Sequence, residues 1–509
     1  MNLAHNLGRG RSFFADRPAI LFEGRSISYR ELDESSNRLA NALIALGINR
    51  GDRVAIYLPN IPEFVVVYYG VLKTGAVAVS INSIFKQHEV AFIVNDSGSR
   101  LLFSTAELAA QLKDLEAGGL ERVIEVEQSL QQLLERGSAE FRVIEMQRDD
   151  PALILYTSGT TGFPKGATLS HGNVVSNTWS VVHHAGYRPD DRLILFLPLF
   201  HVFGQNFIMN ACFLAGSTLV LHRRFVPDSV LDSIARDQVT MFFGVPSIYV
   251  ALLNLFGSPP PFTGEGRVEA LSSIRYWFSA AATMPQEISR RWTERFGSPI
   301  FEGYGLTETS PFAAYNHDFQ HRFGSVGTAV ENFEIQIVDE TGEDVPTGSL
   351  GEIAIKGPGV MLGYWGRPQD TSLAIRDGWF HSGDIGSMDD QGYVFIVDRV
   401  KDMINRSGFK IWPAEVEQLL YRHPAVKEAA VYAVADAESG EAVAAAIVLR
   451  DGASATALEI TEYCRARAAV YKAPTRVDFV SELPRNPTGK ILKRVLRERA
   501  AQSQPAPAP

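Results

Sequence analysis

The sequence predicts an α/β protein with a large N-terminal domain of stacked, mostly parallel sheets and helices, a small β-rich lobe, and a small α+β C-terminal domain. Three observations lead to this prediction. The chain has 509 residues, more than one hydrophobic core usually supports, so at least two domains are expected. From about residue 20 onward, apolar runs typical of strands alternate with helical patterns, which favours parallel sheets covered by helices. Near residue 330 the pattern changes to short strands separated by turns.

The first part of the chain alternates regularly between the two periodicities. A strand-like run, SISYREL (26–32), is followed by a helical pattern at 37–47, a strand at 53–59 and a second helical pattern at 62–75. Later strands are predicted by apolar runs that glycine, proline or polar residues bound, namely LLFST, ALILYTS, RLILFLPL, STLVLH and MFFGVPS. We therefore expect residues 1–398 to form the large domain.

The second part of the chain is expected to divide near Asp398. Before it, residues 330–398 carry short strand patterns with turns, which predict the β-rich lobe. After it, residues 399–499 combine the strand GFKIWP, a helix through AEVEQLLYRH and two further strands, enough for a small α+β domain. Pro413 suits the first turn of that helix. The last ten residues, 500–509 (AAQSQPAPAP), are expected to form a disordered tail.

Composition narrows the functional classes. Hydrophobic residues make up 46% of the chain and charged residues 21%, as in ordinary globular proteins. A net charge of -10 gives no reason to expect nucleic acid as a partner. No signal peptide or integral membrane segment is recognised, so a cytoplasmic location is expected. Cys212 and Cys464 are too few for a disulfide framework and lack the spacing of a zinc site.

The strongest chemical signal is YTSGTTGFPKG, which spans Tyr156 to Gly166 and follows a buried-strand pattern. Hydroxyl groups, glycines that let backbone N–H groups approach, and a lysine cation suit a polyphosphate. The candidate ligands are Thr157, Ser158, Gly159, Thr160, Thr161 and Lys165. The loop is not a Walker A motif, because Pro164 and Gly166 flank the lysine. A flexible surface loop is the alternative interpretation of this composition.

The loop and six further motifs resemble those of the adenylate-forming superfamily, which includes acyl-CoA synthetases, luciferases and the adenylation domains of peptide synthetases. The resemblance extends from about residue 10 to residue 498. The other motifs, in chain order, are PLFHVFG, FSAAATMP, GYGLTETSP, WFHSGDIG, DRVKDMINRSGFKIWPAEVE and PRNPTGKILKRVLR. Seven motifs in register make coincidence an unsatisfactory explanation. The most similar members are bacterial fatty acyl-CoA ligases.

The resemblance implies a site for ATP and Mg²⁺. Glu308 would coordinate magnesium with help from Thr307, and Asp384 would accept hydrogen bonds from the ribose. The adenine would pack on Tyr304 and Gly305, with its edge near Ala280, Ala281 and Ala282, while Arg399 would contact the ribose or the phosphates. These residue types suit a reaction in which charge develops on phosphate oxygens. An isolated Glu is more often a solvated carboxylate, and an Asp at a turn can simply cap a helix.

The resemblance also implies a mobile C-terminal domain. Lys490 would bind the carboxylate and the α-phosphate during adenylation and then leave, with Lys401 as the hinge and Gly408 beside the pantetheine tunnel of coenzyme A. His201 would lie between the acyl pocket and the nucleotide and act as a gate. The alternatives are a solvated surface lysine, a glycine in a tight turn, and a hydrogen-bonded core histidine.

The function implied is that of an ATP-dependent acid–CoA ligase, which forms an acyl-adenylate and then the acyl-CoA. A medium- or long-chain fatty acid is the favoured substrate, because the candidate pocket segments 244–253 and 310–315 contain no cation for a dicarboxylate. An aryl acid of the cinnamate or benzoate type, or loading of a carrier protein, is the alternative. The expected partners are the acid, ATP and CoA, with a homodimer as the commonest assembly. A luciferase-like monooxygenase and an inactive binding homologue are the remaining hypotheses, and Lys165, Glu308 and Lys490 argue against the second.

Overall fold

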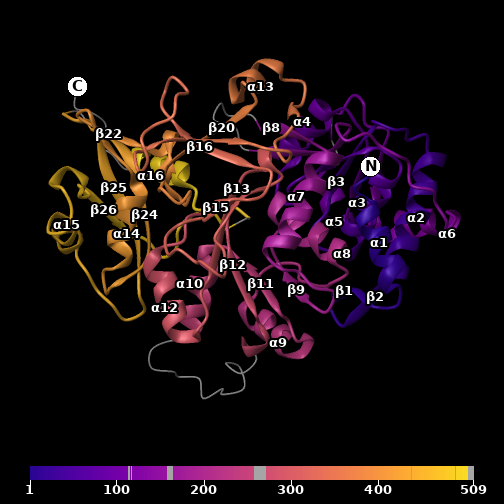
Figure 1. Cartoon of the computed structure of the whole chain (residues 1–509), viewed down its shortest axis with the longest axis horizontal. Helices are drawn as coiled ribbons and strands as arrows, with labels where there is room; N and C mark the ends of the chain where they lie inside the picture. The colour runs from indigo at the N-terminus through magenta and orange to yellow at the C-terminus, as the bar shows by residue number, and fades with distance from the viewer. Residues whose placement is uncertain are drawn as a thin grey trace.

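The computed structural model describes residues 1–112, 115, 117–157, 164–256, 271–436, 438–487 and 489–502. Within these residues, two large sheets lie side by side, with the small lobe above them and the C-terminal domain at one end (Figure 1). The strands of both large sheets are mostly parallel, as the alternating pattern predicts. The predicted α/β class is confirmed.

The first large sheet contains seven strands in the part of the chain described. Their order is β18 (Gly363–Tyr364), β8 (Lys165–Ser170), β7 (Pro151–Thr157), β4 (Val77–Ser80), β3 (Arg53–Tyr57), β5 (Ser99–Ser104) and β6 (Arg122–Glu125). The strands from β7 to β6 are parallel, whereas β8 is antiparallel to both of its neighbours. Helices in the same stretch are α2 (Tyr29–Ala45), α3 (Pro62–Lys73), α4 (Gln87–Ser97), α5 (Ala106–Ala109), α6 (Gln131–Arg136) and α7 (His171–His184).

The second large sheet has nine strands, again counted over the described residues. Their order is β15 (Thr328–Ala329), β14 (Phe312–Tyr315), β13 (Phe301–Gly305), β12 (Tyr276–Ser279), β11 (Met241–Gly244), β9 (Arg192–Leu195), β10 (Thr218–Leu221), β1 (Pro18–Phe22) and β2 (Arg25–Ser28). The six strands from β13 to β1 are parallel. Helices associated with this part of the chain are α1 (His5–Phe14), α8 (Ala211–Ala215), α9 (Pro227–Asp237), α10 (Pro246–Leu255) and α12 (Gln286–Phe296).

The predicted β-rich lobe is an antiparallel sheet. It consists of β16 (Glu334–Val338), β17 (Gly351–Lys356), β20 (Trp379–Met388) and β19 (Ile375–Arg376), with β21 (Val394–Arg399) also paired to β20. The short helix α13 (Pro368–Ala374) connects β18 of the first large sheet to β19 of the lobe. The lobe is therefore tied to the strand that begins at Lys165.

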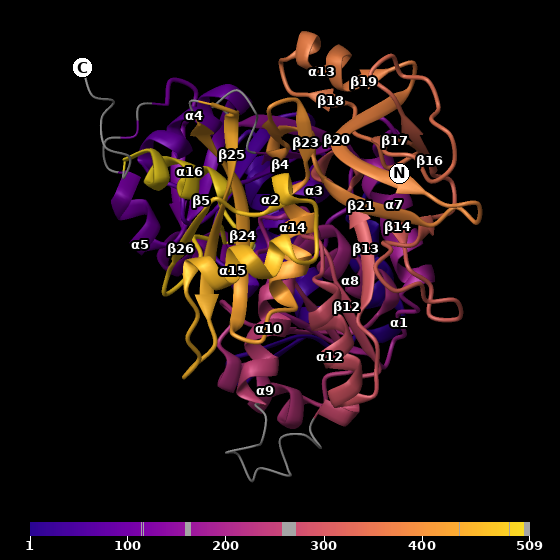
Figure 2. The same ribbon diagram turned by 90° about the vertical axis from the view of Figure 1, so that its left-hand side faces the viewer.

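The last part of the chain packs around its own sheet, in front of the large sheets in Figure 2. Its strands are β23 (Phe409–Ile411), β22 (Ile404–Arg406), β25 (Gly440–Leu449), β24 (Val426–Asp436) and β26 (Arg476–Phe479), and its helices are α14 (Pro413–Tyr421), α15 (Ala457–Arg465) and α16 (Lys493–Gln502). Most of its buried apolar side chains form clusters of their own, whereas Tyr421 of α14 joins the core of the large sheets. The division at residue 398 stays a prediction that these separate clusters support.

Two local predictions differ from the structure. The run SISYREL was expected to be a strand, but β2 ends at Ser28 and α2 begins at Tyr29. The cause is a capping box, in which Glu31 N–H donates to Ser28 Oγ (3.2 Å) and Ser28 N–H donates to the Glu31 carboxylate (2.8 Å). At the other end, α16 continues to Gln502, so residues 500–502 are helical and not part of a tail. Residues 503–509 of the predicted tail lie outside the described residues.

The apolar helix α3 carries a buried cation in the core. Lys73 is 1% exposed, and its ammonium donates to Asp33 Oδ1 (2.7 Å), Ser36 Oγ (2.6 Å) and Asn37 Oδ1 (2.7 Å) on α2. Burial lowers the pKa of Lys73 to about 8, while the Asp33 carboxylate opposes that shift. This polar contact fixes α3 against α2.

Over the part of the chain described, no helix is both long and apolar enough to cross a membrane.

Candidate active site

Residues from five distant motifs meet between the large sheets and the C-terminal domain. Arg399 Nε lies 3.0 Å from Asp384 Oδ1, and Tyr304 donates its hydroxyl to Asp384 Oδ2 at 2.7 Å. The charges of Arg399 and Asp384 both act on Lys490 of the C-terminal domain, and Lys490 in turn acts on His201. Arg399 and Asp384 also act on Glu308. The predicted residues of the PLFH, YGLTE, SGD, DRVKD and PTGK motifs therefore share one site.

The lobe positions Asp384 and Arg399 through strand pairing. The two residues face each other in the antiparallel pair β20–β21. Asp384 is 4% exposed, and its backbone N–H donates to Ser382 Oγ at 3.1 Å. A buried carboxylate needs compensating partners, and here the guanidinium and the Tyr304 phenol supply them. Binding of a ribose would require hydroxyl groups to reach this carboxylate, so the ribose role stays a prediction.

Glu308 lies on a 3₁₀ turn, Thr307–Thr309, directly after β13. The preceding Gly305 is required sterically, because a Cβ atom there would lie 1.6 Å from the Pro311 carbonyl oxygen. Glu308 is 8% exposed, and burial raises the pKa of its carboxyl group. Tyr364 donates its hydroxyl to Glu308 Oε1 at 3.0 Å, and Thr157 Oγ1 lies 3.5 Å from the same oxygen.

A magnesium ion fits this arrangement only with help from a substrate. Among the described residues, no three His, Cys, Asp or Glu side chains form a group that could hold a metal ion. Mg²⁺ is commonly bound through one or two carboxylates together with substrate phosphates and water. The single buried carboxylate of Glu308, with the Thr307 hydroxyl beside it in the chain, matches that mode.

Lys490 enters the site on a turn of the C-terminal domain. Asn486 fixes this turn by accepting the Lys490 backbone N–H at 2.8 Å, and Gly489 adopts φ +82°. A Cβ atom on Gly489 would lie 2.6 Å from Val245 Cγ2, so glycine lets the turn approach the large domain closely. Burial, followed by the nearby Arg399 cation, lowers the pKa of Lys490 to about 8. Lys490 is half-buried against the large domain, so it is not a fully solvated lysine, and its role in adenylation stays a prediction.

His201 is neutral in its surroundings. Burial and the charge of Lys490 lower its pKa to about 4. The Phe203 backbone N–H donates to His201 Nδ1 at 3.3 Å, so the proton of the neutral ring lies on Nε2. His201 therefore offers a hydrogen-bond donor beside Lys490. Its gating role stays a prediction.

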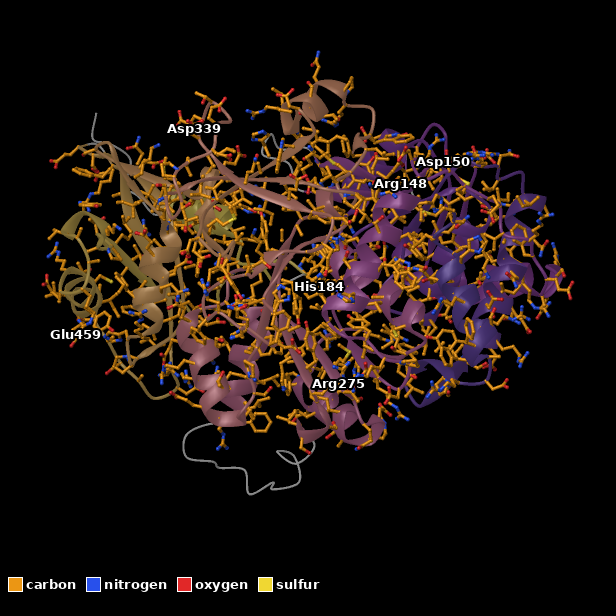
Figure 3. All side chains as sticks on the ribbon, in the orientation of Figure 1. Arg148, Asp150, His184, Arg275, Asp339 and Glu459 are labelled. Carbon is orange, nitrogen blue, oxygen red and sulfur yellow. The ribbon has the colours of Figure 1, made fainter. Side chains whose placement is uncertain are left out.

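Aromatic rings form the wall next to His201. Phe207 stacks on Phe278 with ring centroids 4.7 Å apart, and it meets Phe203 at 5.3 Å and Phe312 at 5.1 Å. Phe278 lies on β12 and packs against Gly303, where an added Cβ atom would be 2.6 Å from the Phe278 ring. Behind this group, the ring of His184 lies 5.9 Å from that of Phe312, and Figure 3 shows His184 near the middle of the molecule. We call Phe203, Phe207, Phe278 and Phe312 the aromatic wall.

The remaining predicted residues are placed as follows. Ala280, Ala281 and Ala282 follow β12, with Ala281 at φ +70° and the last two exposed, and their contact with adenine stays a prediction. Lys401 lies on a 3₁₀ turn, Val400–Asp402, where burial and the Arg399 cation lower its pKa. Gly408 adopts φ +87° in the turn between β22 and β23, which is the alternative interpretation of that residue. Ser158, Gly159, Thr160 and Thr161 lie outside the described residues.

The sequence analysis did not identify two further residues, Glu302 and Asp370. Glu302 is 7% exposed on β13, opposite Ser279 of β12, and burial raises its pKa to about 8 although the Met284 backbone N–H bonds to it. A glutamate within the apolar strand FEGYG is the signal that could have found it. Asp370 on α13 contacts Lys165, and no local sequence pattern marked this residue. Spacing along the chain cannot reveal that contact.

Comparison with known proteins agrees with this geometry. Residues 11–365 match the family described as AMP-binding enzyme, and residues 415–490 match its C-terminal domain. The chain belongs to this family, and the predicted membership of the adenylate-forming superfamily is confirmed. Relatives include a feruloyl-CoA synthase of Amycolatopsis sp, 38% identical over 94% of this chain and 95% of the relative. A long-chain-fatty-acid–CoA ligase of Bacillus subtilis is 33% identical over 96% of this chain and 93% of the relative.

Solved structures resemble nearly the whole chain as well. An anthranilate CoA ligase in complex with anthranoyl-AMP superposes with a TM-score of 0.91 at 29% identity, covering 98% of this chain and 97% of that one. ATP-bound MatB from Rhodopseudomonas palustris gives 0.89 at 34% identity over 98% and 99% of the two chains. The apo form of the same protein gives only 0.78 at the same identity. The present structure is therefore more similar overall to the ATP-bound form of that protein than to its apo form.

Proposed function

We propose that this protein is an ATP-dependent acid–CoA ligase. In the first half-reaction the carboxylate oxygen of the acid attacks the α-phosphorus of ATP, and pyrophosphate leaves to give an acyl-adenylate. In the second, the thiol sulfur of CoA attacks the acyl carbonyl, AMP leaves, and the thiol proton passes to solvent or a base. The observation that carries the proposal is the convergence of Lys490, Arg399 and Asp384 from two parts of the chain.

The first half-reaction brings two anions together, so the site has to supply positive charge. Lys490 has a pKa of about 8, so most of it is protonated at neutral pH and can contact both the attacking carboxylate and the α-phosphate. Arg399, held by Asp384, adds a second cation. Mg²⁺, when bound at Glu308 with the ATP phosphates, would supply further charge stabilisation. His201 can donate from Nε2 to an oxygen of the acid beside Lys490.

The acyl group is proposed to be apolar. The aromatic wall lies next to His201, and its rings offer contacts to hydrocarbon but no cation for a second carboxylate. A fatty acid is the favoured class, and an aryl acid is the second candidate, because rings packed at these distances can also stack on an aromatic acyl group. Relatives named for both classes have comparable coverage.

The second half-reaction requires the site to change. CoA has to reach the acyl carbonyl that Lys490 and its turn now cover, so we propose that the C-terminal domain rotates at Lys401 once pyrophosphate has left. The rotation would carry Gly408, whose added Cβ would meet nothing within 4 Å here, to the path of pantetheine. Free CoA is the proposed acceptor, with a carrier protein as the alternative.

Release of AMP and pyrophosphate with a panel of acids tests the proposal. The panel contains butyrate, octanoate, palmitate, ferulate, benzoate, malonate and an amino acid, each with and without CoA. AMP release that depends on CoA and is greatest with one apolar acid would support the ligase. Pyrophosphate exchange without thioester would indicate a carrier protein as acceptor. The absence of both with every acid would contradict the proposal.

A further inference from the structure

The lysine of the phosphate loop is paired with a carboxylate of its own chain. Lys165 Nζ lies 2.5 Å from Asp370 Oδ1, and the two side chains are 15% and 28% exposed. The same ammonium group lies 5.2 Å from the centroid of the Tyr364 ring. A cation contacted by a carboxylate and an aromatic face has part of its charge already compensated.

Strand pairing brings Lys165 and Asp370 together, although they are 205 positions apart in the sequence. Gly363 and Tyr364 of β18 pair with Thr168 and Ala167 of β8. The Trp365 backbone N–H then donates to the Gly166 carbonyl at 2.7 Å. The chain enters α13 at Pro368, so Asp370 lies in the first turn of this helix. In Figure 1, α13 lies at the top of the molecule, above β8.

Asp370 has a second cation within reach. Arg367 Nη1 lies 3.8 Å from Asp370 Oδ2, and Arg367 Nη2 lies 3.8 Å from Asp96 Oδ1. The Arg367 Nε atom is buried and has no hydrogen-bond partner among the residues that the structure describes. If Lys165 moved away, the Asp370 carboxylate could therefore turn to Arg367 and stay paired. The contact between Lys165 and Asp370 can open without leaving an isolated charge.

We propose that Asp370 competes with the polyphosphate of ATP for Lys165, so that ATP binding must displace this carboxylate. The inference rests on the proposed function, in which Lys165 binds phosphate oxygens. The Asp370 carboxylate that already contacts the ammonium group repels a phosphate oxygen that approaches the same cation, so the two anions compete for Lys165. The segment that carries Asp370 also carries Tyr364, which donates to Glu308. One segment, Gly363–Ala374, thus covers both the lysine and the carboxylate that the triphosphate and its metal would use.

Binding of MgATP to the full chain without acid or CoA tests this inference, measured by isothermal titration calorimetry. D370N should tighten binding by roughly two- to fivefold, the factor expected for loss of a partly exposed ion pair. In a K165A background, D370N should leave the ATP affinity unchanged, because the competition needs the lysine. D390N, which removes an exposed carboxylate from a turn of the lobe, is the matched charge control.

Equal ATP affinity of the wild type and D370N, or weaker binding by D370N, would overturn the inference while leaving the ligase proposal intact. An equal effect of D370N with and without Lys165 would also overturn it, since that result indicates a general field effect. Failure of every variant, including the wild type, to bind MgATP would contradict the proposed function itself. D370S, with thermal unfolding of each variant as a check, guards against a folding defect of D370N.

Discussion

Lys490 is proposed to act in the first half-reaction and not in the second. We expect Lys490→Ala to lower the rate of adenylate formation by at least about a hundredfold, because it removes a cation positioned for charge developing at the α-phosphate. Thioester formation from a supplied acyl-adenylate should be nearly unchanged. Pyrophosphate exchange and single-turnover thioester assays measure the two steps separately. An equal loss in both steps would contradict the assigned role.

Lys493→Ala is a suitable control for that substitution. Lys493 lies three positions further along and pairs with Glu417 at 2.9 Å within the C-terminal domain. The Lys493→Ala substitution removes a lysine from the same segment but keeps Lys490, the cation near Asp384 and Arg399. Loss of the ion pair with Glu417 should lower the stability of the protein, but the ratio of the adenylation rate to the thioester-forming rate should stay as in the wild type.

Glu302 makes stability depend on pH. Its pKa is about 8 in the folded protein and about 4.5 when exposed, so the unfolded chain loses its proton first as pH rises. Between these values the folded state is destabilised by up to about 1.4 kcal/mol per pH unit, and the loss levels off above pH 8. Glu302→Gln, which cannot ionise, should therefore gain stability relative to the wild type from about pH 5 to 8. Urea unfolding at several pH values measures the difference, and a constant difference would contradict the buried protonated carboxyl.

Single residues show clearly what sequence can and cannot predict. Glu308, Asp384, Arg399 and Lys490 were identified from motifs, because their chemistry requires particular residue types in particular sequence neighbourhoods. Glu302 was overlooked although it interrupts an apolar strand, and Asp370 was missed because its contact with Lys165 is tertiary and no local pattern records it. Asp370 in particular acquires its partner only when β18 joins β8.

At the scale of elements, the aromatic wall should limit the depth of the acyl pocket. Phe207, 1% exposed, stacks on Phe278 and contacts Phe312, and its removal would leave a cavity next to the acyl position. We expect Phe207→Ala to shift the preference toward longer acids by at least about tenfold in the ratio of kcat/KM for palmitate over octanoate. The substitution should also cost about 3 to 5 kcal/mol of stability.

A second buried phenylalanine provides the matched control for the pocket. Phe213 of α8 packs against Tyr29 at 6.0 Å and Tyr69 at 5.9 Å, outside the aromatic wall. Phe213→Ala should destabilise the protein to a similar extent without changing the order of substrates. A shift of chain-length preference in both variants would show that looser packing alone alters selectivity, and the pocket role of Phe207 would then be wrong.

The elements themselves were predictable where periodicity is strong. The parallel strands β3, β5, β7, β9, β10 and β11 follow apolar runs that the sequence marks clearly. The start of α2 was missed because a capping box at Ser28 overrides the β-branched and aromatic residues around it. Strand β18 has two residues, too few for any periodic signal, and only its pairing with β8 defines it.

At the scale of the whole molecule, the proposed rotation gives a direct test at Lys401. Proline fixes φ near −65°, so Lys401→Pro should restrict the torsion change that a domain rotation needs. We expect adenylation to stay within about threefold of the wild type and thioester formation to fall by at least about a hundredfold. Lys401→Ala keeps a free torsion while removing the same charge, which lies near Lys490. Survival of both half-reactions in the proline variant would contradict the rotation.

The arrangement of the domains was not readable from the sequence. Separate apolar clusters follow from composition on either side of residue 398, but the placement of the C-terminal domain depends on few contacts. Gln286 N–H donates to Gln418 Oε1 at 3.1 Å, and the Lys490 turn packs on Val245. Contacts this limited suit an interface that forms and breaks during a reaction cycle.

The late strand β18 also has a consequence for synthesis on the ribosome. Thr168 and its neighbours on β8 are made long before Gly363 and Tyr364, which complete that edge of the sheet. Until the later residues emerge, a nascent chain presents an unpaired strand edge to solvent, and such edges readily associate with other chains. Fragments that end before residue 363 should therefore aggregate during expression, whereas fragments that end after α13 should not for this reason.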